Sequence, residues 1–261
     1  MRLSLTIAFL TLMGVPSAHA QENKTMNLAR PQLTYDDVRA VAPGLEAYTR
    51  DRLLGDVWKR PGLTPRDRSI ITVAGLIARN QTIEMPYHFN LALDNGVKPA
   101  ELSEIITHLA FYAGWANAMS AVVVAKDVFT DRKIGADQLP AAAPKLLPLN
   151  ETTEAARKQR VAEMFDATFP GVTEYTTDVL FRDLWLRPDL APRDRSLVTI
   201  SALLASGQVA QLAGHINIGM NNGLKQAEIA EALTHLAFYV GWPNVFTAMP
   251  IAKEAFEKRP R

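Results

Sequence analysis

Glu84 and His88 stand four residues apart, a spacing that places both side chains on one face of a helix. A carboxylate beside an imidazole can orient one ring nitrogen and raise the histidine pKa, which suits a general acid or base. The same spacing returns as Gln211 and His215, where an amide can orient the ring without stabilising its charge. We therefore predict Glu84 and His88 as the main catalytic pair and His215 as a second catalytic residue. The structural alternative is a surface ion pair.

Two matching Arg-Asp-Arg triplets, at 66–68 and 193–195, could bind the carboxylates of a substrate. Arginine suits this task because its planar guanidinium donates two parallel hydrogen bonds to one carboxylate. The alternative is a charge network at the start of a helix. The predicted substrate-binding arginines are Arg66, Arg68, Arg193 and Arg195.

A recurring aromatic motif supplies further candidates. His108-Leu-Ala-Phe-Tyr-Ala-Gly-Trp115 returns as His235-Leu-Ala-Phe-Tyr-Val-Gly-Trp242. Tyrosine and tryptophan combine apolar area with one hydrogen-bond donor, so they suit the walls of a substrate pocket or of an interface. For His108, a hydrogen-bonded histidine in the protein core is the alternative. The predicted pocket residues are His108, Tyr112, Trp115, His235 and Trp242.

Composition narrows the chemistry further. The chain has 28 basic and 27 acidic residues, which gives no electrostatic case for nucleic acid or an anionic membrane. It has no cysteine, which excludes disulfides and thiol chemistry. Glu84 and His88 supply only half of a metal site, and His108 is not placed beside them by spacing, so we predict no metal. No motif for a serine triad or a phosphate loop is present.

These candidates lie in an internal duplication. The segment 58–129 aligns without a gap on 185–256, and 34 of the 72 aligned pairs are identical. A repeat at a fixed offset sets the architecture, and two copies indicate a duplicated domain.

Helical signals run through each copy. Thr64-Pro65 opens a helix with a capping residue and a proline at the first turn, and apolar residues then recur at helical spacing to Ala78. Further helices are expected over 45–58, over 81–93 with a kink at Pro86, from Pro99, and over 116–130. The chain is therefore expected to be all-α, with two tandem similar helical domains and no sheet.

The N-terminus resembles an export signal. Arg2, the apolar run 3–15 and Ala18-His19-Ala20 predict a signal peptide at 1–20, cleaved before Gln21, and hence a periplasmic or secreted protein with no membrane attachment after cleavage. An uncleaved anchor is the alternative. We place the first domain at 32–132, a linker rich in proline and alanine at 133–158, and the second domain at 159–257.

The combination of motifs resembles the carboxymuconolactone decarboxylase family, which is related to alkyl hydroperoxidase D. The matching segments in the first copy are 65–69, Glu84 with His88, 92–96 and 108–115. The hydroperoxidase branch needs a Cys-x-x-Cys pair. Gln81 and Glu84 stand there in the first copy, so thiol peroxidase activity is excluded.

The resemblance implies an all-helical fold and a carboxy-lyase activity without cofactor, on a small γ-lactone carboxylate similar to 4-carboxymuconolactone. It also implies a homo-oligomer, with a trimer of this chain acting as a pseudo-hexamer. Two alternatives stay open. One is another cofactor-free lyase, isomerase or lactone hydrolase, and the other is a non-catalytic periplasmic binding or assembly module. Export of such a protein is unexpected, because the family's role in aromatic catabolism is cytoplasmic.

Overall fold

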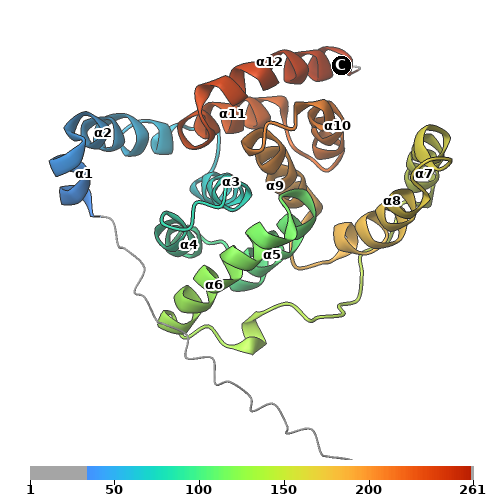
Figure 1. Cartoon of the computed structure of the whole chain (residues 1–261), viewed down its shortest axis with the longest axis horizontal. Helices are drawn as coiled ribbons and strands as arrows, with labels where there is room; N and C mark the ends of the chain where they lie inside the picture. Colours follow the sequence, from blue (N-terminus) through green and yellow to red (C-terminus); the bar gives the residue numbers. More distant parts are fainter. Residues whose placement is uncertain (1–33, 260–261) are drawn as a thin grey trace, which may run out of the picture. The chain divides into compact units, whose positions relative to one another are not determined.

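The computed structural model describes residues 34–259, and every regular element among them is a helix (Figure 1). The all-α prediction is therefore confirmed, whereas the predicted signal peptide lies outside the described residues. The first copy contains α1 (Tyr35–Val41), α2 (Pro43–Tyr48), the π-helix η1 (Thr49–Leu54), the 3-10 helix η2 (Val57–Lys59), α3 (Pro65–Ala78), α4 (Met85–Asp94), α5 (Pro99–Tyr112) and α6 (Trp115–Asp131).

The second copy repeats this order after a short 3-10 helix, η3 (Ala136–Gln138). It contains α7 (Glu151–Phe165), α8 (Pro170–Tyr175), the π-helix η4 (Thr176–Phe181), η5 (Leu184–Leu186), α9 (Pro192–Ala205), η6 (Val209–Gln211), α10 (Leu212–Asn221), α11 (Gln226–Val240) and α12 (Trp242–Glu257). Helix α7 begins at Glu151 because the Asn150 side chain caps it, so the extended connector ends earlier than expected.

Two predicted helices differ in detail. The helix expected over 81–93 begins at Met85, because residues 82–84 form a turn. Pro86 consequently lies in the first helical turn, where a missing N–H costs nothing and no kink is required. The single helix expected over 45–58 is divided into α2, η1 and η2.

The centre of the protein is the pair α3 and α9, which pack against each other (Figure 1). Their start is explained locally: the Thr64 hydroxyl accepts a 3.0 Å hydrogen bond from the backbone of Asp67, and Pro65 occupies the first position. From Asp67 to Ala78, and again from Asp194 to Ala205, every residue is buried. The buried apolar side chains of both copies form one continuous core.

Each copy also reaches across to the other. Helix α11 packs on α3, and α5 packs on α9. The domain boundaries given above remain predictions, but a site built around α3 or α9 must draw residues from both copies.

A glycine separates the two halves of each aromatic motif. Gly114 adopts φ +95° between α5 and α6, and its counterpart Gly241 adopts φ +90° between α11 and α12. This region of backbone conformation is open almost only to glycine. The histidine and tryptophan that bound each motif therefore lie on different helices.

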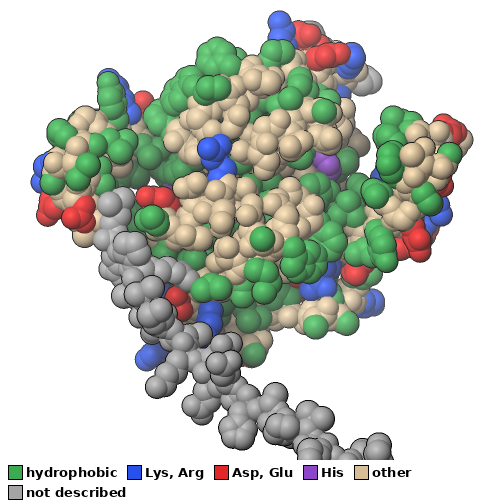
Figure 2. Space-filling view, viewed as in Figure 1, with side chains coloured by type: hydrophobic (Ala, Val, Ile, Leu, Met, Phe, Trp, Pro, Cys, Tyr) green, Lys and Arg blue, Asp and Glu red, His purple; other side chains and the backbone are tan. Residues whose placement is uncertain are grey.

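Helices α6 and α12 keep an apolar face at the surface. Helix α6 buries one face, which includes Ala121 and Val124, whereas Val122 and Val123 are exposed. Figure 2 shows hydrophobic side chains at the surface over both α6 and α12. No helix in the range 34–259 is long and apolar enough to span a bilayer.

Candidate active site

A fully buried arginine joins the two copies on each side of the core. On α3, Arg68 donates from Nη2 to the Glu231 carboxylate at 2.8 Å and to the Arg60 carbonyl at 2.6 Å. Arg60 pairs with the same carboxylate at 2.8 Å. Burial alone would raise the Glu231 pKa, but the hydrogen bonds from Arg60 and Arg68 outweigh it and hold that pKa below its ordinary value.

A matching cluster has its buried arginine in the second copy and its carboxylate in the first. Arg195 on α9 donates to the Glu104 carboxylate of α5 at 2.5 Å and to the Arg187 carbonyl at 2.9 Å. Arg187 contacts Glu104 at 2.8 Å. Both buried carboxylates thus have two cationic partners, as a charge in a dry interior requires.

The buried arginines in turn hold a histidine of the opposite copy. His235 Nδ1 lies 3.2 Å from Arg68, and its Nε2 lies 2.8 Å from the Thr72 hydroxyl. Because Thr72 donates its own proton to the Arg68 carbonyl, it accepts from Nε2–H, and Nδ1 is left to accept from Arg68. Burial, and then the charge of Arg68, lower the His235 pKa to about 3, so this imidazole is neutral.

His108 is held in the same way. Its Nε2 lies 2.7 Å from the Thr199 hydroxyl, and its Nδ1 lies 3.4 Å from Arg195. Burial lowers the His108 pKa well below its ordinary value, with the Arg195 charge adding to the effect. Both nitrogens of each motif histidine therefore have partners inside the protein.

His88 lies in an aromatic enclosure built by both copies, which we call the His88 site. Trp58 stacks on its ring with centroids 6.1 Å apart, and Tyr239 meets it edge-on at 5.3 Å. The Trp58 indole donates a 2.8 Å hydrogen bond to the Tyr239 hydroxyl. The buried Nδ1 atom of His88 has no hydrogen-bond partner among the described residues, and burial lowers the His88 pKa to about 4.

The His215 site is the counterpart. Trp185 stacks on His215 at 6.1 Å, Tyr112 meets it edge-on at 5.3 Å, and Trp185 donates a 2.9 Å hydrogen bond to the Tyr112 hydroxyl. The His215 Nδ1 atom is likewise buried without a partner in the described part of the chain. Burial lowers its pKa to about 4.

The predicted partnership of Glu84 and His88 is wrong in its electrostatics. Glu84 is exposed at the start of α4, and neither nitrogen of His88 has a hydrogen bond to it. The His88 pKa is lowered by burial rather than raised by a carboxylate. Glu84 precedes the first residue of α4 and is exposed, whereas His88 is buried in an aromatic enclosure.

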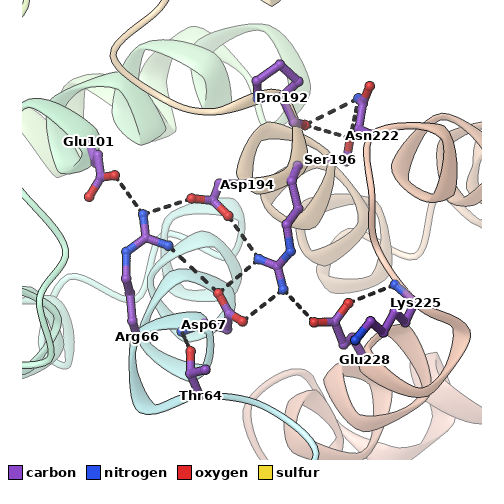
Figure 3. Close-up of polar contacts among 11 residues, drawn as sticks. Thr64, Arg66, Asp67, Glu101, Pro192, Asp194, Ser196, Asn222, Lys225 and Glu228 are labelled. Atoms are coloured by element: carbon purple, nitrogen blue, oxygen red, sulfur yellow. Dashed lines mark hydrogen bonds and ion pairs between the residues drawn. The ribbon is translucent and has the colours of Figure 1, made fainter.

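The four predicted substrate-binding arginines are already paired inside the protein. Arg66 donates to Glu101 at 2.7 Å and to Asp194 at 2.8 Å, and Arg193 donates to Asp67 at 2.9 Å (Figure 3). The contacts with Asp194 and with Asp67 cross between α3 and α9, whereas the contact with Glu101 joins α3 to α5. Arg66 and Arg193 thus connect the copies, and Arg68 and Arg195 hold the buried carboxylates described above. The charge-network alternative is the one that the structure favours, since all four guanidinium groups have protein partners.

The predicted aromatic pocket residues do not lie together in one site. Tyr112, which was predicted as a pocket residue, lines the His215 site of the other copy, because α5 packs on α9. Trp115 is 63% exposed and its ring contacts Phe111, and Trp242 is 51% exposed with its ring against Phe238. Neither tryptophan lies in an enclosure around a histidine of the described chain, so their exposed positions fit the interface alternative better than a pocket wall.

Five residues of these sites were missed by the sequence analysis: Trp58, Trp185, Tyr239, Glu104 and Glu231. The repetition of Trp58 as Trp185 in the sequence was the available signal. The two carboxylates also repeat, but their role depends on the exchange of helices between copies, which no local pattern encodes.

The sites combine neutral imidazole, phenol and indole groups, so they can donate hydrogen bonds and transfer a proton inside an apolar enclosure. In the range 34–259, no three histidine or carboxylate side chains are arranged to hold a metal ion. A cavity of about 290 Å³ lies elsewhere, between α7 and α8, and is lined by residues that include Lys158, Asp166 and Thr173.

Comparison with known proteins agrees with this architecture. The model of the carboxymuconolactone decarboxylase family matches the chain twice, at 43–127 and 170–254. The chain is similar to the 4-carboxymuconolactone decarboxylase of Acinetobacter baylyi, with 38% identity over 85 residues that make up 33% of this chain and 63% of the relative. It is also similar to the nitrosuccinic acid decarboxylase npaB of Metarhizium robertsii, with 34% identity over 89 residues that cover 34% of this chain and 62% of the relative.

Fold and site together define a duplicated all-helical protein with two histidine-centred aromatic sites, each shared between the copies. The two family matches reproduce the internal duplication and cover most of the chain. The chain belongs to the carboxymuconolactone decarboxylase family. The matched part spans less than two thirds of the length of either relative named above.

Proposed function

We propose that this protein is a cofactor-free decarboxylase of a small carboxylate whose departing carboxyl group is attached to a carbon that can pass its electron pair to an electron-accepting group, as in 4-carboxymuconolactone. The observation that carries the proposal is the buried histidine with an unpartnered Nδ1 atom in an aromatic enclosure. Family membership supports it, because both similar proteins are named as decarboxylases.

The reaction needs little from the protein. The bond between the ring carbon and the carboxylate breaks, carbon dioxide leaves, and the electron pair moves through the ring double bond into the lactone carbonyl. The resulting dienolate then takes one proton on carbon. The protein must stabilise the developing oxyanion and deliver that proton.

A tyrosine supplies the oxyanion contact. The Tyr112 hydroxyl accepts a hydrogen bond from Trp185, which is a donor only, so its own proton points elsewhere. Burial raises the Tyr112 pKa above its ordinary value, so the phenol keeps its proton and remains a donor. Tyr239 with Trp58 repeats the arrangement in the His88 site.

The histidine delivers the proton. Without substrate, burial keeps His88 and His215 neutral, with pKa values of about 4. A substrate carboxylate beside the ring raises the imidazole pKa, because an opposite charge stabilises the protonated form. Substrate binding is therefore coupled to uptake of the proton that the carbon later receives.

Substrate profiling tests the proposal. Purified protein is incubated with 4-carboxymuconolactone and with nitrosuccinate, whose nitro group can also accept electrons, and released carbon dioxide is measured. Turnover of either compound, without added metal or cofactor, is the expected result. Absence of carbon dioxide release from both would overturn the proposed activity.

We also propose that the protein forms a homo-oligomer. The two copies present equivalent exposed apolar side chains, so the surface of one copy can meet that of another molecule. These residues are Phe111, Trp115, Met119 and Val122 in the first copy, and Phe238, Trp242, Phe246 and Met249 in the second. Light scattering is expected to give the mass of a trimer, whereas a monomer would contradict the proposal.

Export is the third element of the proposal, and it rests on the charged, apolar and small-residue regions of 1–20. Expression in a bacterial host with a C-terminal tag is expected to give a periplasmic protein that begins at Gln21. A cytoplasmic protein with an intact Met1 would contradict export without affecting the proposed activity.

A further inference from the structure

The two sites are not equivalent, and the first difference lies beside the histidine. In the His88 site, the Tyr87 ring stands edge-on to His88 with centroids 5.0 Å apart. Gly214 takes the corresponding position next to His215. A Cβ atom built on Gly214 would meet no heavy atom within 4 Å. No side chain at position 214 therefore stands against the His215 imidazole in the way that the Tyr87 ring stands against His88.

The second difference is charge. Glu84 is close enough to the His88 site to contribute to the raised pKa of Tyr239. Gln211, which is neutral, stands in its place in the second copy. The negative charge of Glu84 thus repels a carboxylate ligand at the His88 site. Gln211 carries no charge and exerts no such repulsion at the His215 site.

A cation also lies near the His215 site. The Arg157 guanidinium of α7 lies over the Phe181 ring, 4.2 Å from its centroid. Phe181 stacks on Trp185 at 6.0 Å, and Trp185 stacks on His215. The positive charge of Arg157 also opposes the burial-driven rise of the Tyr112 pKa, which places its field at this site.

One guanidinium nitrogen of Arg157, Nη1, donates no hydrogen bond within the described residues. Its Nε and Nη2 atoms bind the buried carboxylate of Glu154 at 2.8 and 2.6 Å, and Nη2 also donates to Thr177 at 3.1 Å. These contacts fix the guanidinium plane. The Nη1 atom is buried and has no hydrogen-bond partner among the described residues. A fixed, buried guanidinium nitrogen without an acceptor is suited to receive a carboxylate.

We propose that the His215 site is the one that binds the substrate carboxylate, with Arg157 as its anion-binding residue, and that the His88 site does not bind it. The substrate class rests on the proposed decarboxylase function. The assignment reverses the order expected from Glu84, because the acidic residue marks the site that disfavours an anion. Arg30 is the counterpart of Arg157 in the first copy of the repeat, and it lies outside the described residues. The difference between the two sites therefore rests on Tyr87 and Glu84.

Steady-state kinetics of the full chain test the assignment. Arg157→Gln is expected to raise KM about 10- to 100-fold, which corresponds to loss of one charge-assisted hydrogen bond, with a smaller change in kcat. Arg157→Lys keeps the charge and is expected to lose less. Arg160→Gln, an exposed arginine on the same helix, is the matched control and should leave KM unchanged. Equal KM values for Arg157→Gln and the wild type would overturn the proposal.

Calorimetric titration with maleate, a small dicarboxylate, tests binding without turnover. We expect one maleate bound per chain, lost in Arg157→Gln and kept in the exposed-residue control Arg160→Gln. Two equal sites, no binding, or binding unaffected by Arg157→Gln would overturn the proposal. Maleate binding of this kind without release of carbon dioxide from any substrate would instead contradict the decarboxylase function alone.

Unfolding in urea, followed by circular dichroism, shows whether Arg157→Gln remains folded. If this variant is unfolded, Arg157→Lys carries the test, and its KM and maleate affinity must then fall between those of the wild type and complete loss. An Arg157→Lys protein that matches the wild type in both would overturn the role of the guanidinium fork.

Discussion

The indole nitrogen of Trp58 donates a 2.8 Å hydrogen bond to the hydroxyl of Tyr239, although 181 residues separate them in the chain. Trp185 and Tyr112 form the counterpart at 2.9 Å. Each histidine site therefore depends on correct packing of both copies. The duplication does not produce two independent sites in two independent halves, since each half supplies walls to the other.

Separate expression of residues 32–132 and 133–261 tests this dependence. Either fragment alone exposes one face of α3 or α9 and separates a buried arginine from its carboxylate, such as Arg68 from Glu231. We expect each fragment to lack cooperative unfolding by circular dichroism, and a mixture refolded together to regain it. Cooperative unfolding of 32–132 alone would contradict a shared core.

Removal of a buried cation should be far more costly than removal of a surface one. Arg195→Met leaves the Glu104 carboxylate, which is only 1% exposed, with Arg187 alone, and it should lower the free energy of unfolding by about 3–5 kcal/mol. Arg182→Met breaks the exposed pair with Glu151 and should change stability little. Urea denaturation of both variants measures the difference, and similar midpoints would contradict the structural role of Arg195.

The helices were predictable because their signals are local. Thr64-Pro65, the stop at Gly114 and the periodic apolar residues of α3 all act within a few positions of the chain. The sites were predictable only in part, since His88 and His215 stand out by type and repetition. Their aromatic walls come from α11 and α5 of the opposite copy, and such an exchange leaves no local signal.

The arginine prediction failed for a related reason. Arginine is a common anion-binding residue, so Arg66 and Arg68 were reasonable candidates. The sequence alone does not show that they pair with Asp194 and Glu231 of the other copy. Arg157 lies in a segment that was partly expected to be linker, so it was not considered. Its role became visible through the ring stack that leads from Phe181 to His215.

Stability should decrease in mild acid. Burial lowers the pKa of His88 and His215 to about 4 and that of His235 to about 3, whereas an unfolded histidine has a pKa near 6.5. Below about pH 6.5 the unfolded chain binds more protons than the native one, so the free energy of unfolding falls by about 1.4 kcal/mol per pH unit for each such histidine.

Urea denaturation between pH 7 and 4.5 measures this slope. A His88→Gln, His215→Gln double variant has two fewer buried histidines and should show a shallower dependence. An identical slope in the variant would mean that these two rings do not titrate differently in the native and unfolded states.

The rate should also depend on pH. If a protonated imidazole supplies the proton to carbon, kcat/KM follows the protonated fraction of the free enzyme, whose His215 pKa is about 4. Above that value kcat/KM should fall by about tenfold per pH unit, because each unit lowers the protonated fraction tenfold. Constant kcat/KM between pH 5.5 and 7.5 would show that the histidine acts in its neutral form.

Release of carbon dioxide from 4-carboxymuconolactone by single histidine variants is the most direct test of catalysis at the His215 site. Matched His215→Gln and His88→Gln proteins are compared with the wild type under metal-free conditions, after circular dichroism shows that each is folded. We expect kcat of His215→Gln to fall by at least about 100-fold, the range expected for removal of a general acid. His88→Gln is expected to keep near-normal turnover. Undiminished turnover by His215→Gln would contradict catalysis at the His215 site.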